Sequence, residues 1–299
     1  MADLLRPHPS GPSALRLLLN AATESKQPVV LPGCYDALGA RLIEQAGFDA
    51  AYMTGFGTTA GLLGRPDVGL LGLTEMVDNA RRITNAIDLP VLADADTGYG
   101  NQINVIRTVQ EYERAGIAGI HIEDQVMPKK CGHMDNKQVV EASEFVGKIR
   151  AAASSRQNPD FVLIARTDAR APHGLDEAIG RAHACVEAGA DVLFVEALQG
   201  VDEIERVSKE FAGVPLLFNW AEGGKTPQLT YSEIAALGFA MIIMPIGTML
   251  AATQAMQGFL AKLKADGTPA GFADELMGFS EFTDLIGLPE VVDLEQRFS

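Results

Sequence analysis

Short apolar segments alternate with longer segments of helical periodicity along nearly the whole chain. The apolar segments cover residues 28–31, 50–53, 90–93, 119–122, 161–165, 191–195, 215–218 and 241–244. Each is a continuous apolar run, which is typical of a strand buried on both faces of a parallel sheet. Helical periodicity covers residues 13–24, 36–46, 74–86, 104–115, 143–153, 175–188, 201–211 and 231–237.

Eight strands alternating with helices predict a closed (β/α)₈ barrel, a fold that typically needs roughly 250 residues. Several of the predicted helices end on Ala-Gly, at Gly47, Gly116 and Gly189, where glycine favours a helix stop. A doubly wound open sheet is the alternative, but no Gly-x-Gly-x-x-Gly sequence follows the first strand. We therefore predict a single barrel domain over residues 1–299, opened by a helical segment at 1–27.

A C-terminal extension, residues 250–299, follows the eighth predicted strand. It begins with a helix over 250–265 and continues as a tail, 266–299, that a barrel does not need. The tail carries the apolar side chains Phe272, Phe279, Phe282, Leu285 and Leu288. Because a cluster of apolar side chains needs a covering surface, we predict that this extension packs against another subunit.

Composition narrows the class of protein. The net charge of −15 and the pI near 4.7 argue against a nucleic-acid partner. Cys34, Cys131 and Cys185 are an odd and scattered set, which suits free thiols in a reducing cytoplasm. The chain shows no signal-peptide pattern and no apolar run of membrane-spanning length. We expect a soluble cytoplasmic protein without a membrane partner.

Acidic residues gather at the predicted carboxyl ends of strands three and four. Asp94 and Asp96 follow the third strand, and Glu123 follows the fourth. An all-oxygen acidic set suits Mg²⁺ or Mn²⁺, and two neighbouring buried acids repel each other unless a cation offsets them. The alternative is that Asp94 and Asp96 only cap a helix.

Groups suited to anions and to proton transfer follow other strands. Arg166 ends the fifth strand, and its guanidinium fits a substrate carboxylate. Residues 54–57 (Thr-Gly-Phe-Gly) form a glycine-rich turn whose backbone N–H groups offer a second anion site. Cys131 stands between Lys130 and His133, a setting that favours thiolate formation or proton exchange. The alternative for this loop is a solvated surface segment with an incidental cysteine.

Other candidate residues have plainer interpretations. We interpret His121, within the fourth strand, as a core histidine whose polar atoms are satisfied. His183 and Cys185 lie on a predicted helix as packing or surface residues, and nothing near Cys34 activates its thiol.

Four motifs resemble those of the isocitrate lyase/phosphoenolpyruvate mutase superfamily. They are residues 94–100 (Asp-Ala-Asp-Thr-Gly-Tyr-Gly), 121–125 (His-Ile-Glu-Asp-Gln), 129–133 (Lys-Lys-Cys-Gly-His) and 165–169 (Ala-Arg-Thr-Asp-Ala). The resemblance implies a (β/α)₈ barrel assembled as a homotetramer, with the eighth helix exchanged between paired subunits. It also implies Mg²⁺ held directly by Asp94, with Asp96, Glu123 and Asp67 contacting the ion through water.

The same resemblance assigns roles to residues around the site. Backbone groups of Thr54, Gly55 and Phe56, together with Arg166, would hold the carboxylate of a 2-hydroxy or 2-oxo acid. Cys131 would supply a proton on a closing loop, tuned by Lys130 and His133, while Tyr52 would help to remove the 2-hydroxyl proton. Further substrate contacts are assigned to Glu196, Asn219 and Glu222. Trp220 and Pro245 would also face the distal half of the substrate, unless Trp220 is simply a core residue.

The Lys-Lys-Cys-Gly-His sequence is similar to the lyases of the superfamily and implies cleavage of a carbon–carbon bond. The expected reaction is Mg²⁺-dependent cleavage of a 2-hydroxy di- or tricarboxylate, of 2-methylisocitrate or 2-alkylmalate type, to a 2-oxo acid such as pyruvate plus a carboxylate. Residues 222–224 (Glu-Gly-Gly) favour the alkylmalate type. The alternatives are a carboxyphosphonoenolpyruvate phosphonomutase-like enzyme and an oxaloacetate hydrolase. A non-catalytic relative is expected to have lost Asp94, Cys131 or Arg166, and all three are present.

Overall fold

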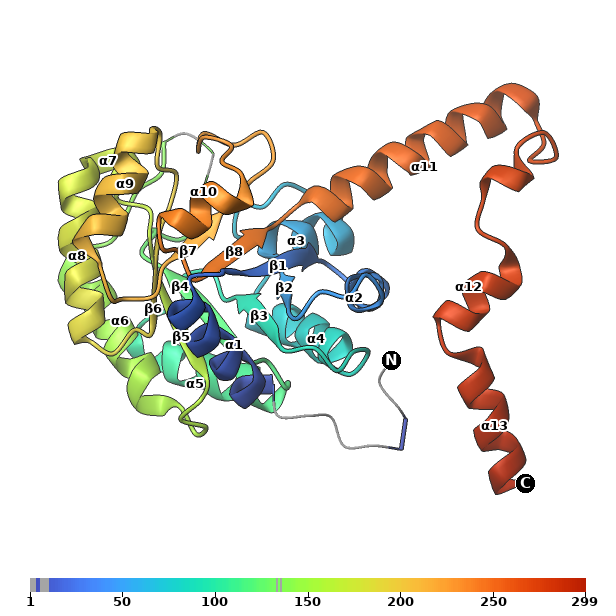
Figure 1. Cartoon of the computed structure of the whole chain (residues 1–299), viewed down its shortest axis with the longest axis horizontal. Helices are drawn as coiled ribbons and strands as arrows, with labels where there is room; N and C mark the ends of the chain where they lie inside the picture. The colour runs from blue at the N-terminus through green and yellow to red at the C-terminus, as the bar shows by residue number, and fades with distance from the viewer. Residues whose placement is uncertain (1–3, 6–10, 133, 135) are drawn as a thin grey trace.

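The computed structural model describes residues 4–5, 11–132, 134 and 136–299, and its centre is a parallel β-barrel (Figure 1). The strands found in these residues are β1 (Val29–Cys34), β2 (Ala51–Met53), β3 (Val91–Asp94), β4 (Gly119–Glu123), β5 (Val162–Thr167), β6 (Val192–Val195), β7 (Leu217–Asn219) and β8 (Met241–Met244). They pair in the order β6-β5-β4-β3-β2-β1-β8-β7. A parallel bridge between Leu193 and Leu216 joins the two ends, so the barrel is nearly closed and the predicted fold is confirmed.

Helices surround the barrel. They are α1 (Gly11–Ser25), α2 (Ala37–Gln45), α3 (Gly55–Leu63), α4 (Leu73–Thr84), α5 (Gln102–Arg114), α6 (Ala142–Ser155), α7 (Arg170–His173), α8 (Leu175–Glu187), α9 (Val201–Glu210) and α10 (Tyr231–Ala236). The glycine-rich turn predicted at 54–57 is instead the start of α3, where the Thr54 side chain accepts from the Gly57 N–H at 3.2 Å. The Thr54 cap provides an acceptor for a backbone N–H in the first turn of the helix. The sequence analysis did not predict this helix.

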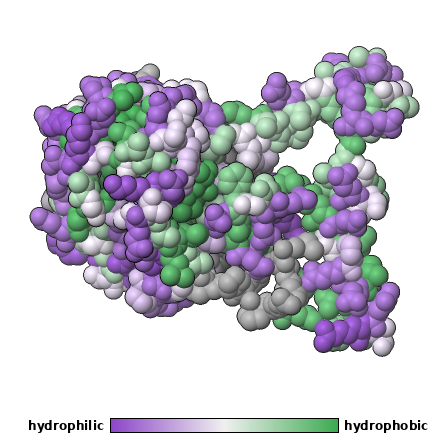
Figure 2. All heavy atoms as spheres, in the orientation of Figure 1, coloured by the Kyte–Doolittle hydropathy of each residue, from purple (hydrophilic) through white to green (hydrophobic). Residues whose placement is uncertain are grey.

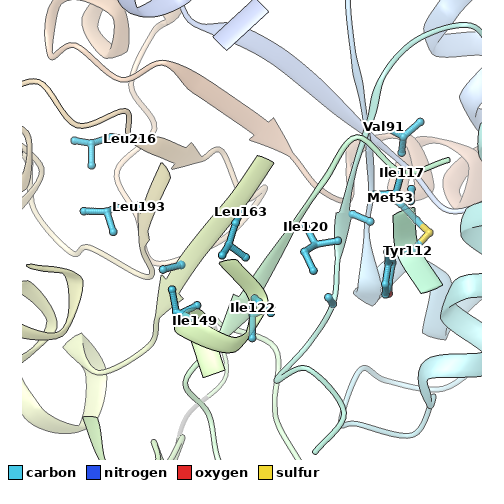
Figure 3. Close-up of a cluster of buried hydrophobic side chains, with 14 of the residues drawn as sticks. Met53, Val91, Tyr112, Ile117, Ile120, Ile122, Ile149, Leu163, Leu193 and Leu216 are labelled. Carbon is cyan, nitrogen blue, oxygen red and sulfur yellow. The ribbon is translucent and has the colours of Figure 1, made fainter. Parts of the chain in front are cut away.

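Two apolar layers hold the barrel together. The outer layer lies between the sheet and the helices, and Figure 3 shows part of it around Ile120, Leu163 and Tyr112. The inner layer fills the barrel with residues such as Leu31, Leu92 and Ile164. Burial of each large apolar side chain contributes about 1.5–3 kcal/mol, so these layers fix the strand ends that carry polar residues.

Helix α1 covers the N-terminal end of the barrel. Its apolar face, Leu15, Leu19 and Ala22, is buried against the inner layer. On its polar side, Arg16 lies 3.0 Å from the carboxylate of Asp191, which immediately precedes β6. The amphipathic pattern predicted for 13–24 therefore serves to seal the end of the barrel opposite the carboxyl ends of the strands.

The C-terminal extension leaves the barrel and runs outward (Figure 1). It consists of α11 (Gly247–Asp266), a 3₁₀ turn η1 (Ala273–Glu275), α12 (Phe279–Leu285) and α13 (Leu288–Phe298). No residue of α11, α12 or α13 is buried. Phe279 is 83% exposed, and apolar surface is visible along the extension in Figure 2. The expected contact with another subunit remains a prediction.

Across the described part of the chain, no helix has both the length and the apolar character to cross a membrane.

Candidate active site

A cavity opens at the carboxyl ends of the strands, the end opposite α1. Its volume is about 670 Å³, part of which is open to solvent. Most of the predicted site residues line it: Tyr52, Thr54, Phe56, Asp67, Asp94, Lys130, Cys131, Arg166, Glu196, Asn219 and Glu222. Asp96 and Glu123 are buried beside it, and His133 lies outside the described residues.

Backbone geometry fixes the acids of strand three. Asp94 ends β3, and its Oδ1 accepts from the Asp96 N–H at 2.9 Å. The Tyr112 hydroxyl donates to the Asp94 carbonyl at 2.9 Å. Helix α5 is capped by Asn101 rather than by either acid, so the capping alternative for Asp94 and Asp96 is wrong. Their carboxylates are directed to the site.

Lys129 occupies the space between the acids, a role that the sequence analysis missed. Its ammonium is buried and lies 2.7 Å from both Asp67 Oδ2 and Asp96 Oδ1. Burial alone would lower the pKa of Lys129, but the acids around it raise that pKa well above its usual value. Burial raises the pKa of Asp96 to about 7 and that of Glu123 well above its usual range. Several buried carboxylates therefore share this region with two cations, Lys129 and Arg166.

His121 and Tyr52 form a buried pair at the floor of the site. His121 Nε2 lies 2.8 Å from the Tyr52 hydroxyl, and His121 Nδ1 lies 3.7 Å from Asp94 Oδ1. Burial lowers the pKa of His121 to about 4 and raises that of Tyr52. His121 is buried as predicted, but its Nδ1 has no hydrogen-bond partner among the described residues, so it is not fully satisfied. Because side chains alternate along a strand, the inward direction of Glu123 could have placed His121 inward as well.

Arg166 lies among acidic side chains. Its Nε and Nη2 donate to the two oxygens of Asp168 at 2.9 and 3.2 Å. Its Nη1 lies 3.2 Å from Glu123 Oε2, and its Nη2 lies 3.6 Å from Glu196 Oε2. These carboxylates raise the pKa of Arg166 well above its usual value against the cost of burial, so the group is a fixed cation.

The Cys131 loop spans residues 125–140, and residues 129–132 of it line the cavity. Its ends are joined by the Gln125–Val139 bridge, and the Gln125 amide donates to the Lys130 carbonyl at 2.8 Å. Cys131 is half-buried and faces the cavity. A Cβ on Gly132 would lie 2.5 Å from Arg166 Nη2, so the loop is packed onto the arginine. This closed arrangement contradicts the alternative of a solvated surface loop.

The distal wall of the cavity is formed by the segments after β7 and β8. Asn219 donates to Glu196 Oε2 at 3.0 Å, and the Ile246 N–H donates to Glu222 Oε2 at 3.4 Å. Trp220 does not line the cavity and packs against the outer apolar layer, which confirms the alternative that it is a core residue. The other cavity-lining residues of this wall are Ala221, Gly223, Gly224, Pro245 and Ile246.

The acids of the site match the ligand chemistry of a hard divalent cation. Asp67, Asp94, Asp96 and Glu123 supply only oxygen. Glu123 Oε1 is buried without a hydrogen-bond partner among the described residues. In the same residues no group of three or more His, Cys, Asp or Glu side chains forms a ready coordination shell. The donor chemistry thus fits a hard cation, while the Lys129 ammonium lies between two of these acids, Asp67 and Asp96.

The fold and site together define a class: a (β/α)₈ barrel enzyme with an acidic, arginine-containing cavity under a cysteine-bearing loop. The chain belongs to the phosphoenolpyruvate phosphomutase family, whose model matches residues 19–264. It is 50% identical over 275 residues to 2,3-dimethylmalate lyase of Eubacterium barkeri, covering 92% of this chain and 95% of the relative. It is 43% identical over 271 residues to 2-methylisocitrate lyase of Aeropyrum pernix, covering 91% and 87%.

A solved structure of a 2,3-dimethylmalate lyase superimposes with a TM-score of 0.91 at 41% identity, covering 98% of this chain and 97% of the other. Together with the sequence relatives, it identifies the chain as a carbon–carbon lyase of the phosphoenolpyruvate mutase/isocitrate lyase superfamily.

Proposed function

We propose that this lyase cleaves a 2-alkylmalate, a dicarboxylate with small alkyl substituents, to a 2-oxo acid such as pyruvate and a second carboxylate, with Mg²⁺ as cofactor. The observation that carries the proposal is the arrangement of one cavity. Acidic oxygens and Arg166 lie at its base, Cys131 lies above, and the distal wall is largely uncharged. The 50% identity to a 2,3-dimethylmalate lyase supports the same substrate class.

Binding of the substrate begins with its carboxylate. Arg166 supplies a fixed guanidinium, and α3 begins beside the cavity, which Thr54 and Phe56 line, so that the N–H groups of Gly55 and Phe56 would contribute the N-terminal anion site of the helix. Asp94 directly, and Asp96, Glu123 and Asp67 through water, would hold Mg²⁺, which would stabilise negative charge on the substrate oxygen at carbon 2.

Cleavage then requires two proton movements. The 2-hydroxyl proton passes to the Tyr52 oxygen while Tyr52 gives its own hydroxyl proton to Nε2 of the neutral His121 imidazole. Carbon 3 takes up the electron pair of the broken bond and is protonated by the Cys131 thiol from the loop. Lys130 and, by resemblance, His133 tune that thiol.

The distal wall selects among substrates. A tricarboxylate such as 2-methylisocitrate places a third carboxylate beyond carbon 3. The wall residues that line the cavity there include the acidic Glu222 and no cation. A buried anion without a partner is costly, whereas an alkyl group fits beside Ala221, Pro245 and Ile246. We therefore place alkylmalates ahead of tricarboxylates.

The test is a 2-oxo-acid release assay with Mg²⁺ on 2,3-dimethylmalate, citramalate, 2-methylisocitrate, isocitrate and oxaloacetate, with a chelator control. Chelator-sensitive release from an alkylmalate supports the proposal. Release from 2-methylisocitrate alone, or hydrolysis of oxaloacetate alone, would refute the proposed substrate class. Phosphorus–carbon bond formation, seen by phosphorus NMR, would refute the proposed carbon–carbon cleavage. Cys131→Ser should abolish turnover but keep Mg²⁺ and product binding; retained cleavage would contradict the role of the thiol.

We also propose a cytoplasmic homotetramer in which α11 is exchanged between paired subunits. The uncovered apolar side chains of the C-terminal extension and three free cysteines support this. Light scattering after size exclusion should give four times the 31.8 kDa chain mass. Leu260→Asp, on a side chain that is 59% exposed, should lower that mass. A monomeric wild-type protein, or cell fractionation that finds it outside the cytoplasm, would overturn these proposals.

A further inference from the structure

A buried lysine, Lys137, joins the Cys131 loop to strand β5. Its side-chain ammonium is almost fully buried and donates to the Gly132 carbonyl at 2.5 Å and to Asp168 Oδ1 at 2.6 Å. A buried ammonium is tolerated only with such partners. Lys137 lies in the second half of the loop. Its contact with Gly132 reaches the loop tip, and its contact with Asp168 reaches the end of β5. Lys137 thus holds the tip against the strand.

Asp168 is a fixed anchor for this contact. Its backbone N–H donates to Asp124 Oδ1 at 2.8 Å, and the neighbouring Thr167 hydroxyl donates to Asp124 Oδ2 at 2.7 Å. Asp124 in turn lies 3.3 Å from Arg181 on α8. These contacts hold the backbone of Asp168 without using Lys137, and Arg166 holds its carboxylate from the barrel side.

The Asp168 carboxylate also orients Arg166, the residue that we expect to bind the substrate carboxylate. Asp168 accepts from Arg166 through both of its oxygens while Oδ1 accepts from Lys137. The space for a Cβ at Gly132 is already occupied by Arg166 and Glu196. One anion thus fixes the arginine and the loop tip that rests on it, beside the Cys131 thiol.

We propose that Lys137 is a positioning residue that latches the Cys131 loop in its closed state through Asp168. Latching makes closure of the loop and orientation of Arg166 depend on the same carboxylate. The catalytic consequence rests on the proposed function, whereas the latch itself does not.

Hydrogen–deuterium exchange of peptides from residues 125–141 tests the latch without any substrate. In Lys137→Met, which keeps the length and loses the charge, exchange in this segment should be about 10- to 100-fold faster, as expected for loss of charge-assisted hydrogen bonds. Lys137→Arg should restore part of the protection. Lys148→Met is the matched control, because Lys148 is also buried but donates to the Thr97 carbonyl at 3.3 Å instead of the loop.

Wild-type protection of the loop in Lys137→Met would overturn the latch, as would equal loosening in Lys148→Met. Asp168→Asn gives a second test if Lys137→Met does not fold: it keeps an acceptor and removes the charge, so intermediate exchange is expected and unchanged exchange refutes the charged bridge. In the lyase assay, kcat of Lys137→Met should fall at least tenfold with unchanged Mg²⁺ affinity. An inactive wild-type enzyme whose loop still loosens in Lys137→Met would refute the proposed function and leave the latch standing.

Discussion

Gly55 supports the acidic site by having no side chain. It is the first residue of α3, with an ordinary helical backbone, so alanine is conformationally acceptable there. A Cβ at this position would lie 2.4 Å from Asp94 Oδ2 and 2.9 Å from its Cγ. Ordinary contacts begin at 3.4 Å. In Gly55→Ala the Asp94 carboxylate must therefore move by about 1 Å, away from the position that we assign to direct metal contact.

The expected effect follows from that displacement. A misplacement of about 1 Å in a reacting constellation costs about 100-fold in rate, or about 2.7 kcal/mol of transition-state stabilisation. We expect Gly55→Ala to lose at least 100-fold in kcat/KM and to bind Mg²⁺ about tenfold or more weakly. Global stability should change little, because the gain in helix propensity, up to about 1 kcal/mol, opposes the local strain.

Calorimetric titration with Mg²⁺ and the 2-oxo-acid assay measure these effects. Gly61→Ala is the matched control: it lies on the same helix, and its Cβ would meet only the Tyr35 ring, at 3.3 Å. It should bind Mg²⁺ as the wild type does. If Gly55→Ala also binds Mg²⁺ and turns over normally, Asp94 is not a direct ligand and the reasoning is refuted.

Three further predictions concern stability. Tyr112→Phe leaves the Asp94 carbonyl without its donor, so urea unfolding should show a loss of about 1–3 kcal/mol; no loss would mean that water replaces the hydroxyl. Burial raises the pKa of Cys34 and Cys185 from 9.0 to about 12. The unfolded chain therefore releases these protons first, and above pH 9 each thiol should cost up to about 1.4 kcal/mol per pH unit. Unfolding in urea from pH 8 to 10.5 measures this slope, which Cys185→Ala should reduce; an equal slope would contradict it. Leu15→Ala opens a cavity under the barrel and should cost about 2–5 kcal/mol in the same assay, and a cost below about 1 kcal/mol would show that α1 is not integral to the core.

The barrel was predictable from the sequence because its signal is local. Continuous apolar runs and Ala-Gly stops are read within a few residues, and strand ends then bring Asp94, Glu123 and Arg166 together by topology alone. The missed helix α3 begins with small residues that carry little periodic signal, and its start depends on the Thr54 cap.

The remaining features depend on contacts between distant residues. Lys129 meets Asp67 from 62 positions away, and Lys137 meets Asp168 from 31 positions away. Contacts at such sequence separations cannot be predicted from a single sequence, because the conformation of the loop determines which lysine is buried. The prediction that His121 is only a core residue fell short for a related reason, because its contact with Tyr52 joins two different strands of the barrel.

Because α1 and the inner apolar layer close the other end of the barrel, the described residues open the cavity at the carboxyl ends of the strands, beside the Cys131 loop. In the proposed reaction, substrate and products would pass this loop. In the proposed reaction the second carboxylate would form next to the Cys131 loop, and the 2-oxo acid would lie deeper, near Asp94. We therefore expect the 2-oxo acid to leave last and to be the product that inhibits competitively against the substrate.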